Sequence, residues 1–121
     1  MTVKDLYDRI GGDYADMCRR IPMDNMISRF VVKFLDDTSC DDLFAAWDAG
    51  DEHAAFEAAH RAKGVCANLS LKRLADLSSE ICEALREGND ELRASTDVDA
   101  LVAELKGCHV EAIAAIKEFA A

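Results

Sequence analysis

A histidine, a lysine and a glycine lie within one turn of one another in an expected helix over residues 51–69, DEHAAFEAAHRAKGVCANL. Consecutive helical residues are about 100° apart, so Lys63 and Gly64 lie beside His60 on the face opposite the apolar stripe of that segment. A neutral imidazole nitrogen is a nucleophile, and a lysine ammonium beside it can neutralise a bound anion as a point charge. These residue types on one exposed face favour an imidazole that takes on an anionic group.

Gly64 is costly at this position, because glycine inside a helix is about 1 kcal/mol less favourable than alanine. The glycines at expected breaks between elements are Gly11, Gly12, Gly50 and Gly88. Gly64 and Gly107 instead lie inside well-patterned helices, and the pattern gives Gly107 no role. The missing side chain at Gly64 leaves room one turn from His60, so the backbone of another molecule can approach the imidazole closely.

The run AHRAKGVCANL over residues 59–69 resembles the signature A-H-x-x-K-G-x-x-x-N-L of histidine phosphotransfer (HPt) domains. The similarity covers about residues 13–119. The site residues that the resemblance implies are His60 (phosphoacceptor), Lys63 (electrostatic aid), Gly64 (clearance for the partner) and Asn68 (support). Ala62 stands where a larger aliphatic residue is common in the family, and Ser70 where glycine often follows the N-L pair. Neither departure is expected to touch the phosphoryl group.

The same resemblance implies a phosphocarrier of two-component signal transduction, not an enzyme, without an ATP-binding domain of its own. The carrier would accept a phosphoryl group on His60 from a receiver-domain aspartate or a hybrid histidine kinase, and pass it to another response-regulator receiver. We expect no cofactor and no metal site in this chain. The receiver partner, with its own acidic pocket, is expected to supply Mg²⁺.

Three other readings are open. The first is a helical adaptor bundle that binds receiver or kinase domains with His60 unmodified, although an adaptor gains nothing from the costly Gly64. The second is the dimerisation domain of a histidine kinase, which typically has an acidic residue and proline after its histidine. His60 is not followed by these residues. The third is a metal-binding bundle, which needs inward-facing ligands where these core stripes are apolar. His53 is expected to be a surface residue rather than a second acceptor, because it lacks the lysine and glycine.

Composition restricts the function further. The 121 residues are expected to form one domain over 1–121, and the net charge of −10 argues against nucleic acid as a partner. No apolar run is long enough to span a membrane, and no signal peptide is expected, so we predict a cytoplasmic protein and a monomer. The five cysteines are expected to be reduced thiols. Residues 58–75 differ from the rest, because they contain four basic residues and no acidic one.

The elements expected to position His60 are all helical. Apolar spacing predicts an all-α fold, an antiparallel four-helix bundle over about residues 22–49, 51–69, 71–87 and 97–119. Pro22 is expected in the first turn of the first of these helices, with a restart near Ser39. Two short N-terminal helices, ending near residue 9 and covering about 13–20, would cap one end of the bundle. Residues 88–95 are expected to be a polar loop.

Capping and seam patterns support these bounds. Thr2 with Asp5, and Thr96 with Asp99, are expected to form capping boxes. In the final helix a heptad seam is predicted, with His109 on its flank. The seam residues are Val98, Leu101, Leu105, Cys108, Ala112, Ala115 and Phe119.

Overall fold

The computed structural model describes residues 1–121 and contains helices and connecting turns, with no strand. The elements are α1 (Val3–Arg9), α2 (Tyr14–Arg20), α3 (Asp24–Lys33), the short 3₁₀ helix η1 (Phe34–Asp36), α4 (Ser39–Asp48), α5 (Glu52–Asn68), α6 (Lys72–Leu85), α7 (Asp90–Ser95) and α8 (Val98–Ala120). The predicted all-α class is confirmed. No helix combines the length and the apolar character needed to cross a bilayer.

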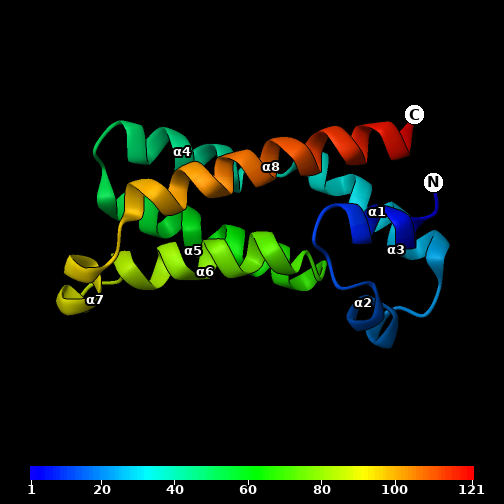
Figure 1. Ribbon diagram of the computed structural model, residues 1–121, viewed down its shortest axis with the longest axis horizontal. Coiled ribbons are helices and arrows are strands. Elements are labelled where there is room, and N and C mark those ends of the chain that lie inside the picture. Colours follow the sequence, from blue (N-terminus) through cyan, green and yellow to red (C-terminus); the bar gives the residue numbers. More distant parts are fainter.

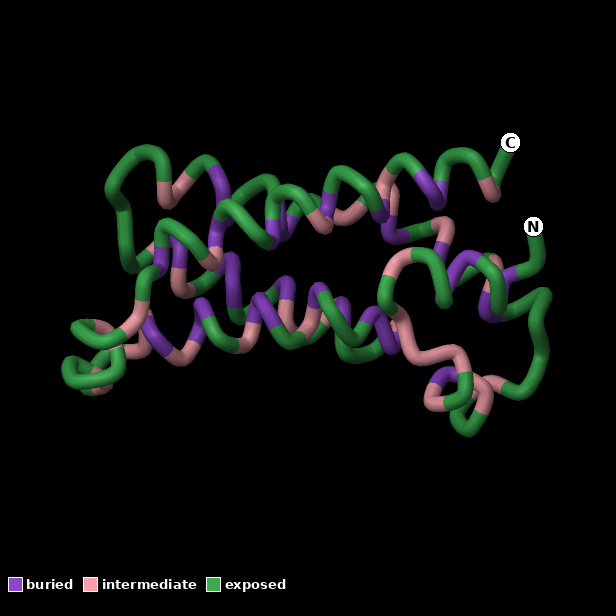
Figure 2. The backbone as a smooth tube through the Cα atoms, in the orientation of Figure 1, coloured by how far each residue is buried: buried purple, intermediate pink, exposed green.

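Four of these helices, α4, α5, α6 and α8, form the antiparallel bundle. Helix α5 packs between α4 and α6, and α8 closes the bundle against both of those neighbours. In Figure 1 the green α5 and α6 run below α4 and the orange-to-red α8, while α1 to α3 gather at one end and α7 at the other. Figure 2 shows the buried stretches of α5, α6 and α8 turned toward the interior.

In α8, two of the buried residues lie one position after the residues predicted for the heptad seam. The buried residues of α8 are Val98, Val102, Leu105, His109, Ala112, Ala115 and Ile116. Leu101, Cys108 and Phe119, which were expected in the seam, are only half-buried. From Val98 to Ala112 both series alternate steps of three and four along a broad apolar stripe, so the spacing alone did not choose between them. The expectation for His109 was wrong, because this side chain belongs to the core.

Local capping differs from the prediction at two helices. The Thr2–Asp5 box is confirmed, with the two reciprocal hydrogen bonds at 3.1 and 3.0 Å. At α8 the cap is Asp97, whose carboxylate accepts from the Ala100 N–H at 3.0 Å. The predicted Thr96–Asp99 box is absent, because the Thr96 hydroxyl donates to the Leu92 carbonyl.

The observed structure differs from the prediction at two further places. Pro22 precedes α3, which begins at Asp24, so it lies outside the first turn. The expected restart near Ser39 is confirmed, since η1 separates α3 from α4. The segment predicted as a polar loop contains the six-residue helix α7.

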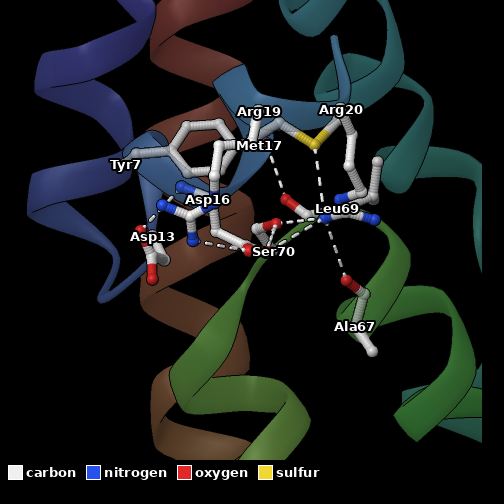
Figure 3. A network of polar contacts seen from close by, with 9 residues as sticks. All are labelled: Tyr7, Asp13, Asp16, Met17, Arg19, Arg20, Ala67, Leu69 and Ser70. Carbon is white, nitrogen blue, oxygen red and sulfur yellow. Dashed lines mark hydrogen bonds and ion pairs between the residues drawn. The ribbon is translucent and has the colours of Figure 1, made fainter.

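The N-terminal segment that contains α1 and α2 is hydrogen-bonded to the turn between α5 and α6 (Figure 3). The Tyr7 hydroxyl donates to the Leu69 carbonyl at 2.8 Å, and the Asp13 N–H donates to the Ser70 carbonyl at 2.8 Å. The Arg20 guanidinium donates to the Ala67 carbonyl at 3.3 Å. These bonds occupy carbonyls at the C-terminal end of α5 that have no partner within the helix. The end of α5 is therefore fixed by residues that lie 47 to 62 positions earlier in the chain.

Candidate functional site

The site is built on α5, whose two ends are both fixed. Its first turn is capped by Asp51, whose carboxylate accepts from the Ala54 N–H at 3.0 Å. Its buried face consists of the small residues Ala55, Ala58, Ala59, Ala62 and Cys66. Ala62 belongs to this face, where neighbouring helices leave room for a small side chain. The opposite face carries His60 into solvent, as predicted.

The imidazole of His60 lies in a shallow cavity of about 410 Å³ between α5 and α6. The cavity is lined by Phe56, Glu57, His60, Arg61 and Arg86. The ring of Phe56, one turn earlier on α5, has its centroid 6.2 Å from that of His60. The cavity is therefore open to a partner and has an apolar wall on the α6 side.

Gly64 is exposed, and a Cβ built on it would meet no atom within 4 Å. Neither packing nor backbone conformation within this chain explains a glycine here. The helix loses propensity at Gly64 without an internal gain. Space on the outer face, one turn from His60, is what this glycine provides.

The Lys63 side chain forms an ion pair with the neighbouring helix α6. Its ammonium lies 3.8 Å from a carboxylate oxygen of Glu83 on α6, and its side chain is 40% exposed. Glu83 also accepts hydrogen bonds from Arg86 at 3.1 and 3.2 Å. These contacts, led by the hydrogen bond from Arg86, hold the pKa of Glu83 below its usual range. Two cations thus share one carboxylate beside the His60 cavity.

Arg86 was missed by the sequence reasoning. It follows the last residue of α6, and its guanidinium lies 5.2 Å from the centroid of the Phe56 ring, within the range of a cation–π contact. This places a second cation in the lining of the cavity that contains His60. Arg86 is 26 positions from His60 in the sequence, so only the register of α6 against α5 brings the two together.

Asn68 lies apart from the other expected site residues. It is the last residue of α5, and eight residues at 1.5 Å each place it about 12 Å along the helix from His60. Asn68 is exposed and lines a different cavity, beside α3. The structure does not bring its side chain to the imidazole.

The remaining histidines and the cysteines have other surroundings. His53 is exposed and pairs with Glu57 at 2.9 Å on the outer face of α5. All five cysteines are free thiols, and Cys40, Cys66 and Cys82 are buried. A hydrogen bond with Cys40 and burial raise the pKa of the Cys66 thiol. No group of three or more His, Cys, Asp or Glu side chains has a geometry that could hold a metal ion.

The comparisons with known proteins identify the family. The model of the Hpt domain family matches residues 32–115, a range that begins near the end of α3 and ends inside α8. No curated protein and no solved structure gives a significant match. The matched range contains the histidine, lysine and glycine of the motif on α5. The chain belongs to the Hpt domain family, whose members carry phosphoryl groups in phosphorelay signalling and interact with receiver and kinase domains.

Proposed function

We propose that this protein is a phosphorelay intermediate with His60 as its phosphoacceptor. It accepts the phosphoryl group from a receiver-domain aspartate, or from a hybrid kinase, and passes it to another response-regulator receiver. The single observation that carries the proposal is an exposed His60 in the middle of α5, next to a glycine that the fold itself does not need. Such a carrier works in the cytoplasm as a monomer and needs no cofactor of its own.

The chemistry is a nucleophilic displacement at phosphorus. The lone pair of the neutral imidazole, at Nε2, attacks in line through a loose transition state. The N–P bond forms while the P–O bond to the aspartyl carboxylate breaks, and the carboxylate departs with the bond electrons. The product is a phosphoramidate of high transfer potential, so the reverse step returns the group to a receiver aspartate. Mg²⁺ would be held in the acidic pocket of the receiver.

The cations around His60 support this chemistry. Arg86 lines the cavity from the α6 side, and Arg61 lines it from the α4 side, where it pairs with Asp42 at 3.1 Å. Lys63 lies one turn from His60 on α5 and pairs with Glu83 of α6. Negative charge is spread over the phosphoryl oxygens in the transition state, and nearby cations stabilise it. Their role is positioning and charge stabilisation, while the imidazole alone forms the covalent bond.

The test is transfer from phosphorylated receivers. The protein is incubated with phosphorylated receiver domains encoded in the same genome, and acid-labile, base-stable phosphate on it is measured. His60→Gln should abolish this phosphate completely, because glutamine keeps a similar size and polarity but forms no transferable phosphoramidate. His53→Gln is the matched control and should accept phosphate at the wild-type rate.

Two results would contradict the proposal. Phosphate remaining on the His60→Gln protein and mapped to His53 or His109 would show that another histidine is the acceptor. A wild-type protein that binds receivers but never takes phosphate would be the adaptor bundle instead. Both variants should melt like the wild type, since His60 and His53 are exposed.

A further inference from the structure

His109 of α8 is a buried histidine that the proposed phosphotransfer does not use. Only 7% of the residue is exposed, and its ring packs against Phe34 and Phe44. Neither ring nitrogen forms a hydrogen bond within the chain, and neither is fully closed off from solvent. A polar group this deeply placed loses free energy when it has no partner. The surroundings of the two nitrogens therefore decide what His109 can bind.

The imidazole of His109 lines a cavity of about 520 Å³ between α8 and the segment that joins α3 to α4. Small-molecule sites are typically about 300–1,000 Å³ in volume, with apolar walls and a few polar groups that converge on the ligand. The lining has this composition. Its apolar members are Leu35, Val110, Ile113 and Ala114, and its polar members are His109, Asp37, Asp41 and Lys117.

The two carboxylates of this cavity have no cationic partner in the chain. Asp37 accepts hydrogen bonds from the N–H of Ser39, at 3.1 Å, and from the Ser39 hydroxyl. Asp41 is exposed in the first turn of α4 and forms neither a hydrogen bond nor an ion pair. The next residue, Asp42, differs because it pairs with Arg61 at 3.1 Å. The negative charge beside His109 is therefore available to a ligand.

The polar groups of the cavity are mainly hydrogen-bond acceptors. Burial lowers the pKa of His109, and the nearby carboxylates of Asp41 and Asp37 oppose this only in part. The neutral imidazole keeps one unprotonated nitrogen, which can accept a hydrogen bond. Two carboxylates against the single ammonium of Lys117 give the lining a net charge of −1. A ligand that suits these groups is positively charged and carries several N–H donors.

The remaining lining restricts the class of ligand further. No three of the His, Cys, Asp and Glu side chains have a geometry that could hold a metal ion, so a bare metal ion does not suit the cavity. An anion would be repelled by Asp37 and Asp41. Val110 and Ile113 offer apolar surface that a hydrocarbon chain can cover. An ammonium or guanidinium group on a short hydrocarbon chain meets all of these conditions.

We propose that the cavity beside His109 binds a small organic cation. Its ammonium or guanidinium group donates to the His109 imidazole and to the carboxylates of Asp37 and Asp41, while its hydrocarbon chain lies against Val110 and Ile113. The site is separate from the phosphoacceptor, because α8 packs against α4 and α6, whereas His60 faces solvent on α5 (Figure 1). A bound cation therefore leaves His60 open, and the inference does not depend on the proposed function.

The experiment titrates agmatine, a guanidinium and an ammonium joined by a short alkyl chain, into the full chain. The titration is followed by NMR at about 150 mM salt, which screens long-range attraction to the acidic surface. Binding should saturate, and the amide shifts should be concentrated in residues 35–41 and 109–117. The imidazole nitrogens of His109 should shift as well, because they accept from the ligand. Glutarate, an anion of similar length, should not bind.

Matched variants separate the cavity from general charge attraction. Asp41→Asn should weaken agmatine binding about fivefold to tenfold, the effect of losing one charge-assisted hydrogen bond. Glu111→Gln removes the same charge from an exposed residue of α8 outside the lining, and should change the Kd less than twofold. His109→Phe keeps an aromatic ring but removes both nitrogens, and should weaken binding to a similar extent as Asp41→Asn. Asp41 is exposed, so its variant tests the site even where His109→Phe does not fold.

Three results would overturn the proposed cation site. The first is the absence of saturable agmatine binding, or shifts spread over the whole acidic surface. The second is an equal loss of affinity in Asp41→Asn and Glu111→Gln, which would mean that net charge alone attracts the ligand. The third is binding of glutarate as tightly as agmatine. The His60→Gln protein should bind agmatine with the wild-type Kd, so failure of phosphotransfer would leave the cation site standing.

Discussion

Glu83 of α6 binds two of the cations near His60. It lies 3.8 Å from the Lys63 ammonium and accepts two hydrogen bonds from Arg86. Arg86 reaches the His60 cavity directly, whereas Lys63 faces the carboxylate. At the scale of single residues, the site therefore draws its electrostatics from α6 as well as from the motif on α5.

Removing either cation should slow transfer without abolishing it. Lys63→Ala and Arg86→Ala should each lower the rate of phosphotransfer roughly fivefold to tenfold, the effect of one partly exposed charge on an anionic transition state. Both losses should shrink as salt rises, because exposed charges are screened. Single-turnover transfer at low and high ionic strength measures this, with Lys106→Ala on α8 as the control. Total loss in either variant with an unchanged melting temperature would mean that the cation does more than stabilise charge.

Substitutions at Gly64 should distinguish its effect on the stability of the fold from its effect on the access of a receiver to His60. Gly64→Ala should leave the fold intact and stabilise it by up to about 1 kcal/mol, since alanine is the better helix former and its Cβ meets no atom within 4 Å. Gly64→Gln should fold equally well but slow transfer, because its side chain occupies the space needed by the receiver. Thermal melts and transfer rates of the two variants are the measurements. A normal transfer rate in Gly64→Gln would defeat the clearance argument.

At the scale of elements, the turn after α5 explains one departure from the family pattern. Ser70 occupies the position where glycine is common, and its φ is +53°, in the left-handed region. A serine there is less favourable than glycine. Hydrogen bonds offset this cost. The Ser70 hydroxyl bonds to Asp16 and Arg20 of α2, and the Ser70 carbonyl accepts from the Asp13 N–H. The N-terminal segment and Ser70 thus depend on each other.

Variants of Ser70 should reveal this dependence. Ser70→Ala loses the hydrogen bonds and keeps the left-handed backbone, whereas Ser70→Gly loses the same bonds but relieves the backbone. Ser70→Ala should therefore be less stable than Ser70→Gly by about 1 kcal/mol. Urea unfolding of both variants gives the two free energies of unfolding. If the alanine variant were the more stable, backbone conformation would not be what distinguishes this position.

On the scale of the whole molecule, His109 couples the core to pH. It is 7% exposed, and its ring packs edge-on against Phe34 and Phe44 at centroid distances of 6.0 and 5.8 Å. Burial lowers the pKa of His109, and the nearby carboxylates of Asp41 and Asp37 oppose this only in part. A neutral imidazole is therefore the form that the folded bundle prefers.

The free energy of unfolding should fall as the pH drops through the unfolded-state pKa of about 6.5. In that window the unfolded chain binds the proton at His109 before the folded chain does, so acid favours unfolding. The loss should level off below the lower pKa of the folded state. His109→Phe should remove this part of the pH dependence, and His53→Gln should retain it. Unfolding free energies between pH 5 and 8 provide the measurement, and an identical slope in wild type and His109→Phe would contradict it.

The fold was predictable wherever local chemistry was unambiguous. The class, the bundle helices and the Thr2–Asp5 cap follow from apolar spacing and capping residues. The break near Ser39 and the exposure of His60 follow from the same patterns. Bounds failed where two local signals competed, as at Thr96 and Asp97, because either side chain suits a helix N-terminus. The six-residue α7 was missed because it has no buried residue and hence no apolar period.

By itself, the sequence determined which helix carries the motif and which family that motif resembles, because helical spacing places His60, Lys63 and Gly64 on one face. Tertiary structure decided what reaches that face from elsewhere. Arg86 enters the His60 cavity through the register of α6 against α5, and Phe30 of α3 lies beside Val65 of α5 through packing at the end of the bundle. The buried seam of α8 was also decided by its neighbours. Contacts of this kind depend on how helices are rotated and aligned against one another, and the local period of one helix does not contain that information.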